Sequence, residues 1–151
     1  GYVTLHAGST GGYVNGATPT TSKFDNPAGI IRQVRSGDIF LFDRNNYRLR
    51  RIEGGTGAVT TFAGSGVNAN DDGVGTSAQI GDKARRGATH PNDYLHYFGH
   101  LNKVRAIRLD TAVVYAVINS AETAGWTSNA DARLARVTIA WGVCFTPDYS
   151  R

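Results

Sequence analysis

The stretch GDIFLFDRNNYRLRRI, residues 37–52, holds two short β-prone segments on either side of a polar turn. Asp38–Asp43 is dominated by isoleucine, leucine and phenylalanine, and Arg48–Glu53 places Leu49 and Ile52 among arginines. Apolar and β-branched runs separated by asparagine and aspartate are typical of neighbouring β-strands. The stretch therefore predicts two strands joined by a tight turn.

The same pattern extends along the whole chain. Glycine is frequent, at 19 of 151 residues, and it marks turns such as Ser36–Asp38 and Gly54–Gly57. No stretch approaches the ~20 apolar residues that a membrane-spanning helix needs. The segments expected to be strands are Val3–His6, Gly29–Val34, Asp38–Asp43, Arg48–Glu53, Ala58–Ala63, Val104–Leu109, Ala112–Asn119, Arg133–Ile139 and Val143–Thr146. The sequence therefore predicts an all-β protein.

Parts of the sequence repeat. The matching pairs are Val3–Ser9 with Val59–Ser65, Pro27–Arg32 and Asp38–Asp43 with Lys103–Arg108 and Val113–Ile118, and Arg48–Ile52 with Arg133–Val137. This alignment places insertions of the second copy in polar stretches at Gly81–His100 and Ser120–Ala130. We therefore expect one unit, residues 1–151, with a first four-stranded blade at about 24–64 and a second at about 78–146, in which 81–100 form a loop insertion.

The first copy resembles the NHL repeat family of β-propellers. The resemblance rests on Phe24–Pro27, Gly37–Leu41, Gly57–Gly64 and above all on Asp43–Ile52, with its aspartate, asparagine pair, leucine and arginines. It covers about half of the chain, and in the second copy Asn119 stands in place of Asp43. The resemblance implies a β-propeller-like fold of antiparallel four-stranded blades, about two NHL-type blades in this chain.

Structural roles follow for several residues of the first blade. Alternating apolar side chains are expected to pack one blade against the next. Asp43 and Asn45 are expected to cap the turn after the second strand through hydrogen bonds to the backbone. The side chains expected in the core between blades are Ile30, Ile39, Leu41, Leu49 and Ile52.

Two blades are too few for a closed ring, because propellers have about four to eight. Exposed blade faces and edge strands favour association, so we expect either a piece of a larger propeller or self-assembly into a homo-oligomer or filament. The outer strands Val3–His6 and Val143–Thr146 are natural points of exchange between subunits. The sequence contains no methionine, which suggests a processed first residue and an extracellular or cell-surface location.

Residues that would indicate an enzyme are scarce. The single cysteine, Cys144, excludes an internal disulfide, and His90, His96 and His100 lack a common zinc spacing. Propeller lyases distantly similar to the NHL family hold a metal with histidines from several blades, whereas His6 is the one histidine outside this cluster. We therefore expect no catalytic residue, metal or cofactor, and a lyase is the less favoured reading.

Arginine and aromatic residues are the candidates for an interaction surface. The net charge of +4 is modest, and arginines on strands are often solvated or paired with acids such as Asp38, Asp43 and Glu53. Some NHL-like propellers bind single-stranded RNA on a basic face, so the alternative function is a propeller that binds single-stranded RNA or a glycan; other protein partners are also open. The candidate residues are Arg32, Arg44, Arg48, Arg50, Arg51, Arg85, Arg86, Tyr94, Tyr97 and Trp126.

Overall fold

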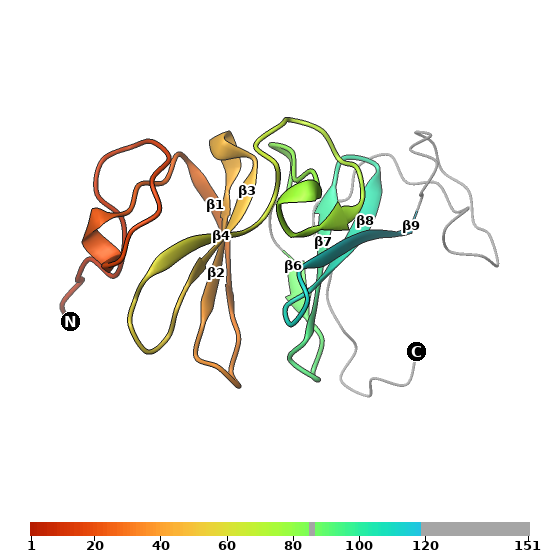
Figure 1. The fold of residues 1–151 in the computed structure, drawn as a ribbon. Coiled ribbons are helices and arrows are strands. Elements are labelled where there is room, and N and C mark those ends of the chain that lie inside the picture. The colour runs from red at the N-terminus through yellow and green to blue at the C-terminus, as the bar shows by residue number, and fades with distance from the viewer. Residues whose placement is uncertain (85–86, 119–151) are drawn as a thin grey trace.

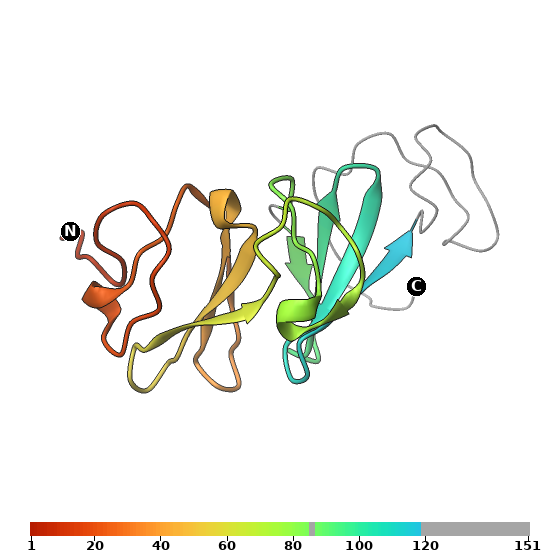
Figure 2. The same ribbon diagram turned by 45° about the horizontal axis from the view of Figure 1, so that its top comes forward.

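The computed structural model describes residues 1–84 and 87–118, and over these residues the chain is all-β, as predicted (Figure 1). Two antiparallel sheets of four and five strands lie next to each other in both Figure 1 and Figure 2. Within the described residues, no helix is both long and apolar enough to cross a bilayer. Outside them lie the expected strands Arg133–Ile139 and Val143–Thr146, the Ser120–Ala130 insertion, and Arg85, Arg86, Trp126 and Cys144.

The first sheet is a meander in chain order. Its strands are β1 (Pro27–Arg32), β2 (Ile39–Asp43), β3 (Arg48–Ile52) and β4 (Val59–Ala63). One-turn 3₁₀ helices η1 (Pro19–Thr21) and η2 (Arg44–Asn46) precede β1 and follow β2. The four strands coincide closely with the segments expected from sequence.

The second sheet repeats this meander and adds a short strand at one edge. Its order is β5 (Gly73–Val74), β9 (Val113–Ile118), β8 (Lys103–Arg108), β7 (Leu95–His100) and β6 (Gly87–Thr89), with the 3₁₀ helix η3 (Gly75–Ser77) after β5.

The loop insertion expected at 81–100 is wrong, because this region contains β6 and β7. The reason is that β7 uses histidine and glycine at buried positions, with His96, Phe98, Gly99 and His100 all buried. These residues hide the apolar alternation by which a strand is recognised. Among the described residues, the second sheet therefore already contains a four-stranded meander like that of the first sheet.

A buried arginine at the same place in each sheet defines the true repeat. Arg50 of β3 donates from Nη2 to Val14 O (2.9 Å) and Asn15 Oδ1 (2.8 Å), and from Nη1 to Lys23 O (3.2 Å). Both Arg50 and Arg105 are 0% exposed. The guanidinium of Arg50 thus fastens the segment that leads into the first sheet, residues 8–26, onto that sheet.

Arg105 of β8 makes the equivalent contacts with residues 65–82. It donates from Nη2 to Asp71 O (2.9 Å) and Asp72 Oδ1 (3.0 Å), and from Nη1 to Gln79 O (2.7 Å). Partners and arginines correspond at offsets of 55 to 57 residues. Each structural unit is therefore a leading segment followed by four strands.

This register corrects the alignment expected from sequence. The cross-strand pairs Ile30↔Leu41↔Arg50 correspond to Gly87↔Phe98↔Arg105, so β1 matches β6 and not β8. The match of Val3–Ser9 with Val59–Ser65, 56 residues apart, agrees with the same offset. The apolar runs misled the alignment because any two strands of a blade look alike, whereas the anchored arginine occurs once per unit.

The main core lies between the two sheets. Ile31, Phe40, Phe42 and Leu49 of the first sheet belong to one buried cluster with Phe98 of the second. The Phe42 and Phe98 rings lie 5.1 Å apart, a favourable distance for tilted aromatic rings.

The expected set of core residues was partly wrong. Leu49 and Ile52 are buried, but Ile30 is 70% exposed and Ile39 and Leu41 are half-buried. The pleat and the register place Ile30, Ile39, Leu41 and Ile52 on the face turned away from the second sheet. Because β1 and β2 are apolar on both faces, sequence alone does not show which face meets the second sheet.

Asp38 joins the two hairpin ends of the first sheet. Its carboxylate accepts hydrogen bonds from Gly54 N (2.9 Å) and Arg51 Nε (2.7 Å). Burial alone would raise the pKa of Asp38, but these donors together hold that pKa below its usual value. A Cβ on Gly54 would lie 2.6 Å from the carbonyl carbon of Gly37, so only glycine permits this close approach of the two turns.

Asp43 has a larger role than the expected turn cap. Its fully buried carboxylate accepts from Asp25 N (2.7 Å) and Asn46 Nδ2 (2.9 Å) and pairs with Arg50 Nη1 (2.8 Å). Asn45 donates its side chain to Asp25 Oδ1 and not to its own turn. The Asp43–Arg50 pair therefore fixes both the η2 turn and the leading segment.

Replacing Arg50 tests this anchor. Arg50→Met leaves the Asp43 carboxylate buried without its cation, so we expect a loss of about 3–5 kcal/mol in the free energy of unfolding, measured with urea. Arg32→Met, at an exposed position of β1, is the matched control and should change stability by less than about 0.5 kcal/mol. Equal effects of the two substitutions would contradict the anchor.

Candidate functional site: the outer face of the first sheet

The first sheet has an apolar face that points away from the second sheet. This outer face, defined as the side chains of Ile30, Ile39, Leu41, Ile52 and Val59, follows from the register of β1 to β4. Ile30 is 70% exposed, whereas Ile52 and Val59 are buried. The segment 8–26 lies on this side of the first sheet (Figure 1). It leaves the β1 edge of that sheet uncovered.

The outer face is equivalent to the face by which the second sheet packs on the first. In the common register, Leu41 corresponds to Phe98, Ile52 to Ile107 and Val59 to Val114. All three counterparts are buried in the core between the sheets. The outer face therefore has the character of a surface that packs against a preceding sheet.

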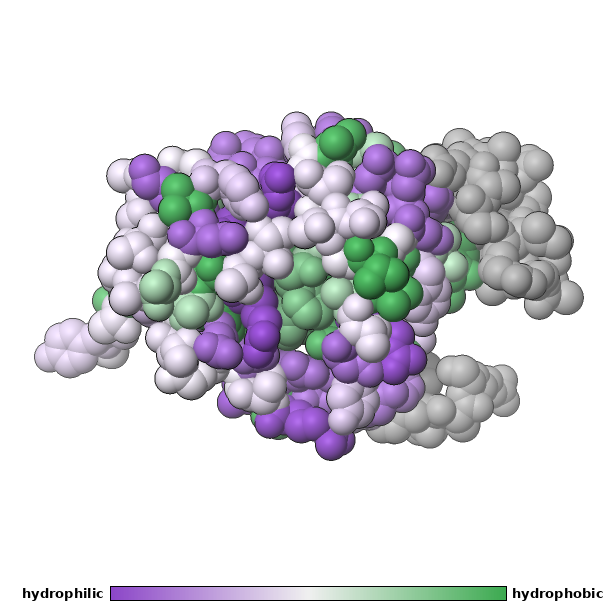
Figure 3. All heavy atoms as spheres, in the orientation of Figure 1, coloured by the Kyte–Doolittle hydropathy of each residue, from purple (hydrophilic) through white to green (hydrophobic). Residues whose placement is uncertain are grey.

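A hollow of about 330 Å³ lies on this face, lined in part by His6, Ile39 and Ile52. The view in Figure 3 shows a mostly hydrophilic surface with apolar residues in small patches, one of them over the junction of the two sheets. The exposed side chain of Ile30 on a strand face therefore contrasts with the mostly hydrophilic surface of that view.

The N-terminal segment is the second unusual feature on this side. Val3–His6 was expected to be a strand, but it forms none. Val3 is 102% and Leu5 68% exposed. The segment that matches the N-terminal segment in the repeat is β4, which pairs with β3. The β4 position of the first sheet is therefore already occupied.

The candidate arginines that the structure describes do not form one basic surface. Arg50 is buried, and Arg51 pairs with Asp38 at 2.7 Å. Arg48 donates to Asn46 O and Ser65 O, with its guanidinium 4.2 Å from the centre of the Tyr13 ring. Arg44 Nε donates to Asp82 O (3.0 Å). Four of the predicted arginines are thus held by contacts within the chain, while Arg32 is exposed.

The candidate tyrosines are also apart. Tyr94 lies under the guanidinium of Arg35, 4.9 Å from it, in the turn between β6 and β7. Tyr97 is half-buried on β7, next to the buried Phe98 and so on the opposite face of the strand. The structure does not bring these aromatic residues together with the arginines of β3.

Asp93, which lies among His90, His96 and His100 in the sequence, joins the two sheets. Its carboxylate accepts Val34 N (3.1 Å) and Arg35 N (2.7 Å), and its carbonyl accepts Gln33 Nε2 (2.9 Å). Asp93 has φ 63°, a left-handed conformation that aspartate and asparagine tolerate better than most residues. The sequence signal that could have identified Asp93 was its position after Pro91 and Asn92 in a turn.

His90, His96 and His100, which were not expected to form a metal site, each have different neighbours. His90 Nδ1 accepts Asn92 N in a turn, and His96 Nδ1 lies 3.0 Å from Thr89 Oγ1. His100 is buried on the same strand as His96. Across residues 1–84 and 87–118, no three His, Cys, Asp or Glu side chains are grouped so that they could hold a metal ion.

Comparison with known proteins supports the fold. No family model matches the chain, and no curated protein sequence matches it. A protein of unknown function from Bacteroides thetaiotaomicron VPI-5482, known from a crystal structure, is similar, with a TM-score of 0.64 and 19% sequence identity. The match covers 79% of this chain and 30% of that one, so the matched part of this chain spans less than a third of the other chain's length.

The Asp93 junction generates a stability prediction. Asp93→Asn keeps the left-handed backbone but removes one acceptor oxygen and the charge, so we expect unfolding to require about 1–3 kcal/mol less. Chemical denaturation measures this loss. Asp110→Asn, in an exposed pair with Arg108, is the control and should leave the midpoint unchanged; an unchanged midpoint for Asp93→Asn as well would contradict the role of Asp93.

His96 generates a pH prediction. Burial lowers the pKa of His96 from 6.5 to about 4, so between these values the unfolded chain binds a proton that the folded chain does not. Stability should therefore fall as the pH drops from 6.5 to 4, with a contribution from His96 of up to about 1.4 kcal/mol per pH unit. Urea unfolding of His96→Gln should lack this part of the slope; parallel pH profiles for both proteins would contradict it.

Proposed function

We propose that the chain is a non-catalytic interaction module built from two NHL-type propeller blades, and that it associates with further copies of itself through the outer face of the first sheet. The observation that carries the proposal is the exposed Ile30 on a face whose counterpart in the second sheet is packed against another sheet. The sequence resemblance at Asp43–Ile52 supports the NHL assignment, since its aspartate and arginine form the buried pair that anchors the unit.

The proposed contact joins two different surfaces. The outer face of the first sheet would receive the face of a second sheet that points away from its own partner, with Tyr97 and Tyr115. Because the two surfaces differ, the contact is head-to-tail and produces either a closed ring or a filament. Three copies would give six blades, within the usual range for propellers.

The N-terminal segment supports the same proposal. Val3–Ser9 repeats the β4 sequence, and its first four residues, Val3–His6, are exposed. The segment therefore suits the fourth position of a sheet that the described part of this chain does not supply. Addition of a strand to a free sheet edge is a common mode of association. An extracellular or cell-surface location is part of this proposal and rests on the composition alone.

No observation favours the alternative, a surface for single-stranded RNA or glycans. That function needs several accessible cations or stacked aromatic rings along one groove. Arg44, Arg48, Arg50 and Arg51 are instead held by contacts inside the chain. Binding of RNA thus stays a prediction from sequence.

The mass of the native particle tests the proposal. Light scattering after gel filtration should give a multiple of the 16.1 kDa chain, and the multiple should fall on dilution if the contact is reversible. A monomer at all concentrations would overturn self-association.

A pair of substitutions locates the contact. Burial of an isoleucine side chain contributes about 1.5–3 kcal/mol, so Ile30→Asp should weaken self-association at least about tenfold. Val67→Asp is the matched control, because Val67 is also exposed, at 54%, but lies in the segment between the sheets. Equal loss with both substitutions would show that added charge, and not the outer face, is responsible.

A further inference from the structure

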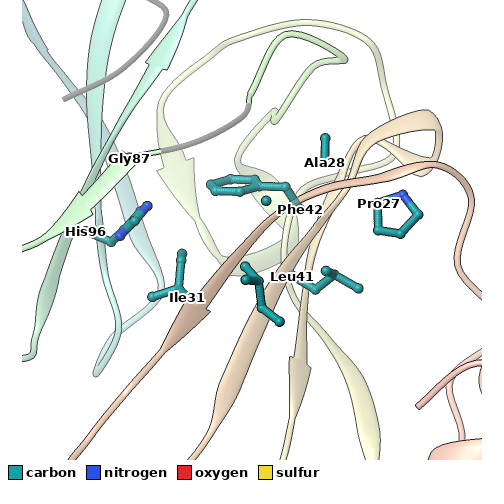
Figure 4. Close-up of a pocket in the computed structure, with 9 residues that line it drawn as sticks. Pro27, Ala28, Ile31, Leu41, Phe42, Gly87 and His96 are labelled. Atoms are coloured by element: carbon teal, nitrogen blue, oxygen red, sulfur yellow. The ribbon is translucent and has the colours of Figure 1, made fainter. Parts of the chain in front are cut away.

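The leading segment of the first unit contains the one Asn-Gly pair in the sequence, Asn15-Gly16. An asparagine before glycine is prone to spontaneous deamidation, because glycine has no Cβ to hinder attack of its backbone nitrogen on the asparagine side chain. Asn15 is exposed, so water reaches its amide. The segment enters β1 at Pro27, which Figure 4 shows on the opposite side of Phe42 from His96 of the second sheet. A reaction at this pair therefore takes place away from the core between the sheets.

Both residues of the pair are tied to the first sheet. Asn15 Oδ1 accepts a hydrogen bond from Arg50 Nη2 (2.8 Å). Gly16 N donates to Val59 O (3.0 Å), and Val59 N donates to Gly16 O (2.8 Å), which makes an antiparallel bridge to the first residue of β4. A Cβ on Gly16 would lie 2.8 Å from the backbone nitrogen of Ser22. The fold therefore requires the same glycine that makes Asn15 reactive.

Deamidation of such a pair proceeds through a cyclic imide. The Gly16 nitrogen forms a bond to Cγ of Asn15, the bond from Cγ to Nδ2 breaks, and Nδ2 leaves as ammonia with the proton of the Gly16 N–H group. Water then adds to one of the two imide carbonyl groups. Addition at Cγ gives aspartate, whereas addition at the main-chain carbonyl gives isoaspartate, in which the backbone is one atom longer. Water is the only co-reactant.

The bridge to β4 controls the first step of this reaction. The imide nitrogen carries no hydrogen, so the bond from Gly16 N to Val59 O is lost when the ring forms. Attachment of the leading segment should therefore slow the reaction by at least about twofold to tenfold, the size of one net hydrogen bond. The reaction is thus favoured in molecules in which the leading segment has opened from β4.

The second unit distinguishes the effects of the two products. In the common register Asp72-Gly73 stands where the first unit has Asn15-Gly16, and the Asp72 carboxylate pairs with Arg105 at 3.0 Å. A carboxylate at this place is therefore compatible with the fold. Isoaspartate is not equivalent, because the added backbone atom takes the glycine nitrogen out of register with its acceptor on the sheet.

We propose that Asn15-Gly16 is a site of spontaneous deamidation, which reacts when the leading segment opens from β4, and that its isoaspartate product loosens this segment from the first sheet. The modification acts on the contacts by which Arg50 and the bridge at Val59 fasten the first unit. It occurs within one chain and does not depend on the proposed self-association.

Peptide mapping of the aged native chain tests the site. After incubation at mildly alkaline pH, mass spectrometry should detect conversion of the Asn15 amide before that of any other asparagine, and methylation by an isoaspartate methyltransferase should identify isoaspartate at position 15. The same chain in denaturing guanidinium chloride should react at least about twofold faster. Earlier modification of another asparagine, no isoaspartate at position 15, or equal rates in the native and denatured chains would overturn the proposal.

A pair of substitutions tests the consequence. In Asn15→Gln the side chain is one carbon longer and would have to close a larger, less favoured ring, so this variant should keep its urea midpoint during ageing. Its midpoint before ageing shows that it is folded. The wild-type chain and the matched control Asn70→Gln, in the leading segment of the second unit, should lose midpoint in step with isoaspartate at position 15. An equal loss in Asn15→Gln, or isoaspartate at position 15 without any loss in the wild-type chain, would show that the modification does not loosen the first unit.

Discussion

The buried guanidinium groups of Arg50 and Arg105 decide how this chain is divided into structural units. Each is fully enclosed and spends its donors on carbonyl groups of the segment that precedes its own sheet. A buried cation without partners is strongly destabilising, so detachment of the segment would leave the arginine without the carbonyl groups that it binds. The unit is therefore a leading segment plus a four-stranded meander, and the two units follow each other at 55 to 57 residues.

This division explains why the two faces of the first sheet differ. One face meets the second sheet through Phe42 and Phe98 and is part of the core. The other has the same strand register as the packed face of the second sheet, yet Ile30 remains open to solvent. A sheet that is apolar on both faces is stable when both are covered, and repeat proteins achieve this by adding units in a row.

The sequence was sufficient for β1, β2, β3, β4, β8 and β9, whose β-branched, leucine and aromatic residues lie between clear turn signals. It failed for β6 and β7 because Gly87 stands where the first unit has Ile30, and because His96 and His100 occupy buried positions that apolar residues usually fill. The choice between faces failed at Ile30 and Ile31 because two adjacent isoleucines point to opposite sides. Asp93 and His96 acquire their roles from contacts with residues of other strands and turns, and no spacing in the sequence records those contacts. Arg50 was identified from the sequence only as a charged candidate for binding, although its position in the repeat was the informative property.

The solvent exposure of Ile30 in the native particle tests most directly whether the outer face is an interface. A crystal or electron cryo-microscopy structure of that particle should show the Ile30 side chain buried beneath a sheet of a neighbouring copy, next to Leu41. If the particle is instead a single chain in which Ile30 keeps the 70% exposure seen here, the outer face is not an interface and the proposed assembly is wrong.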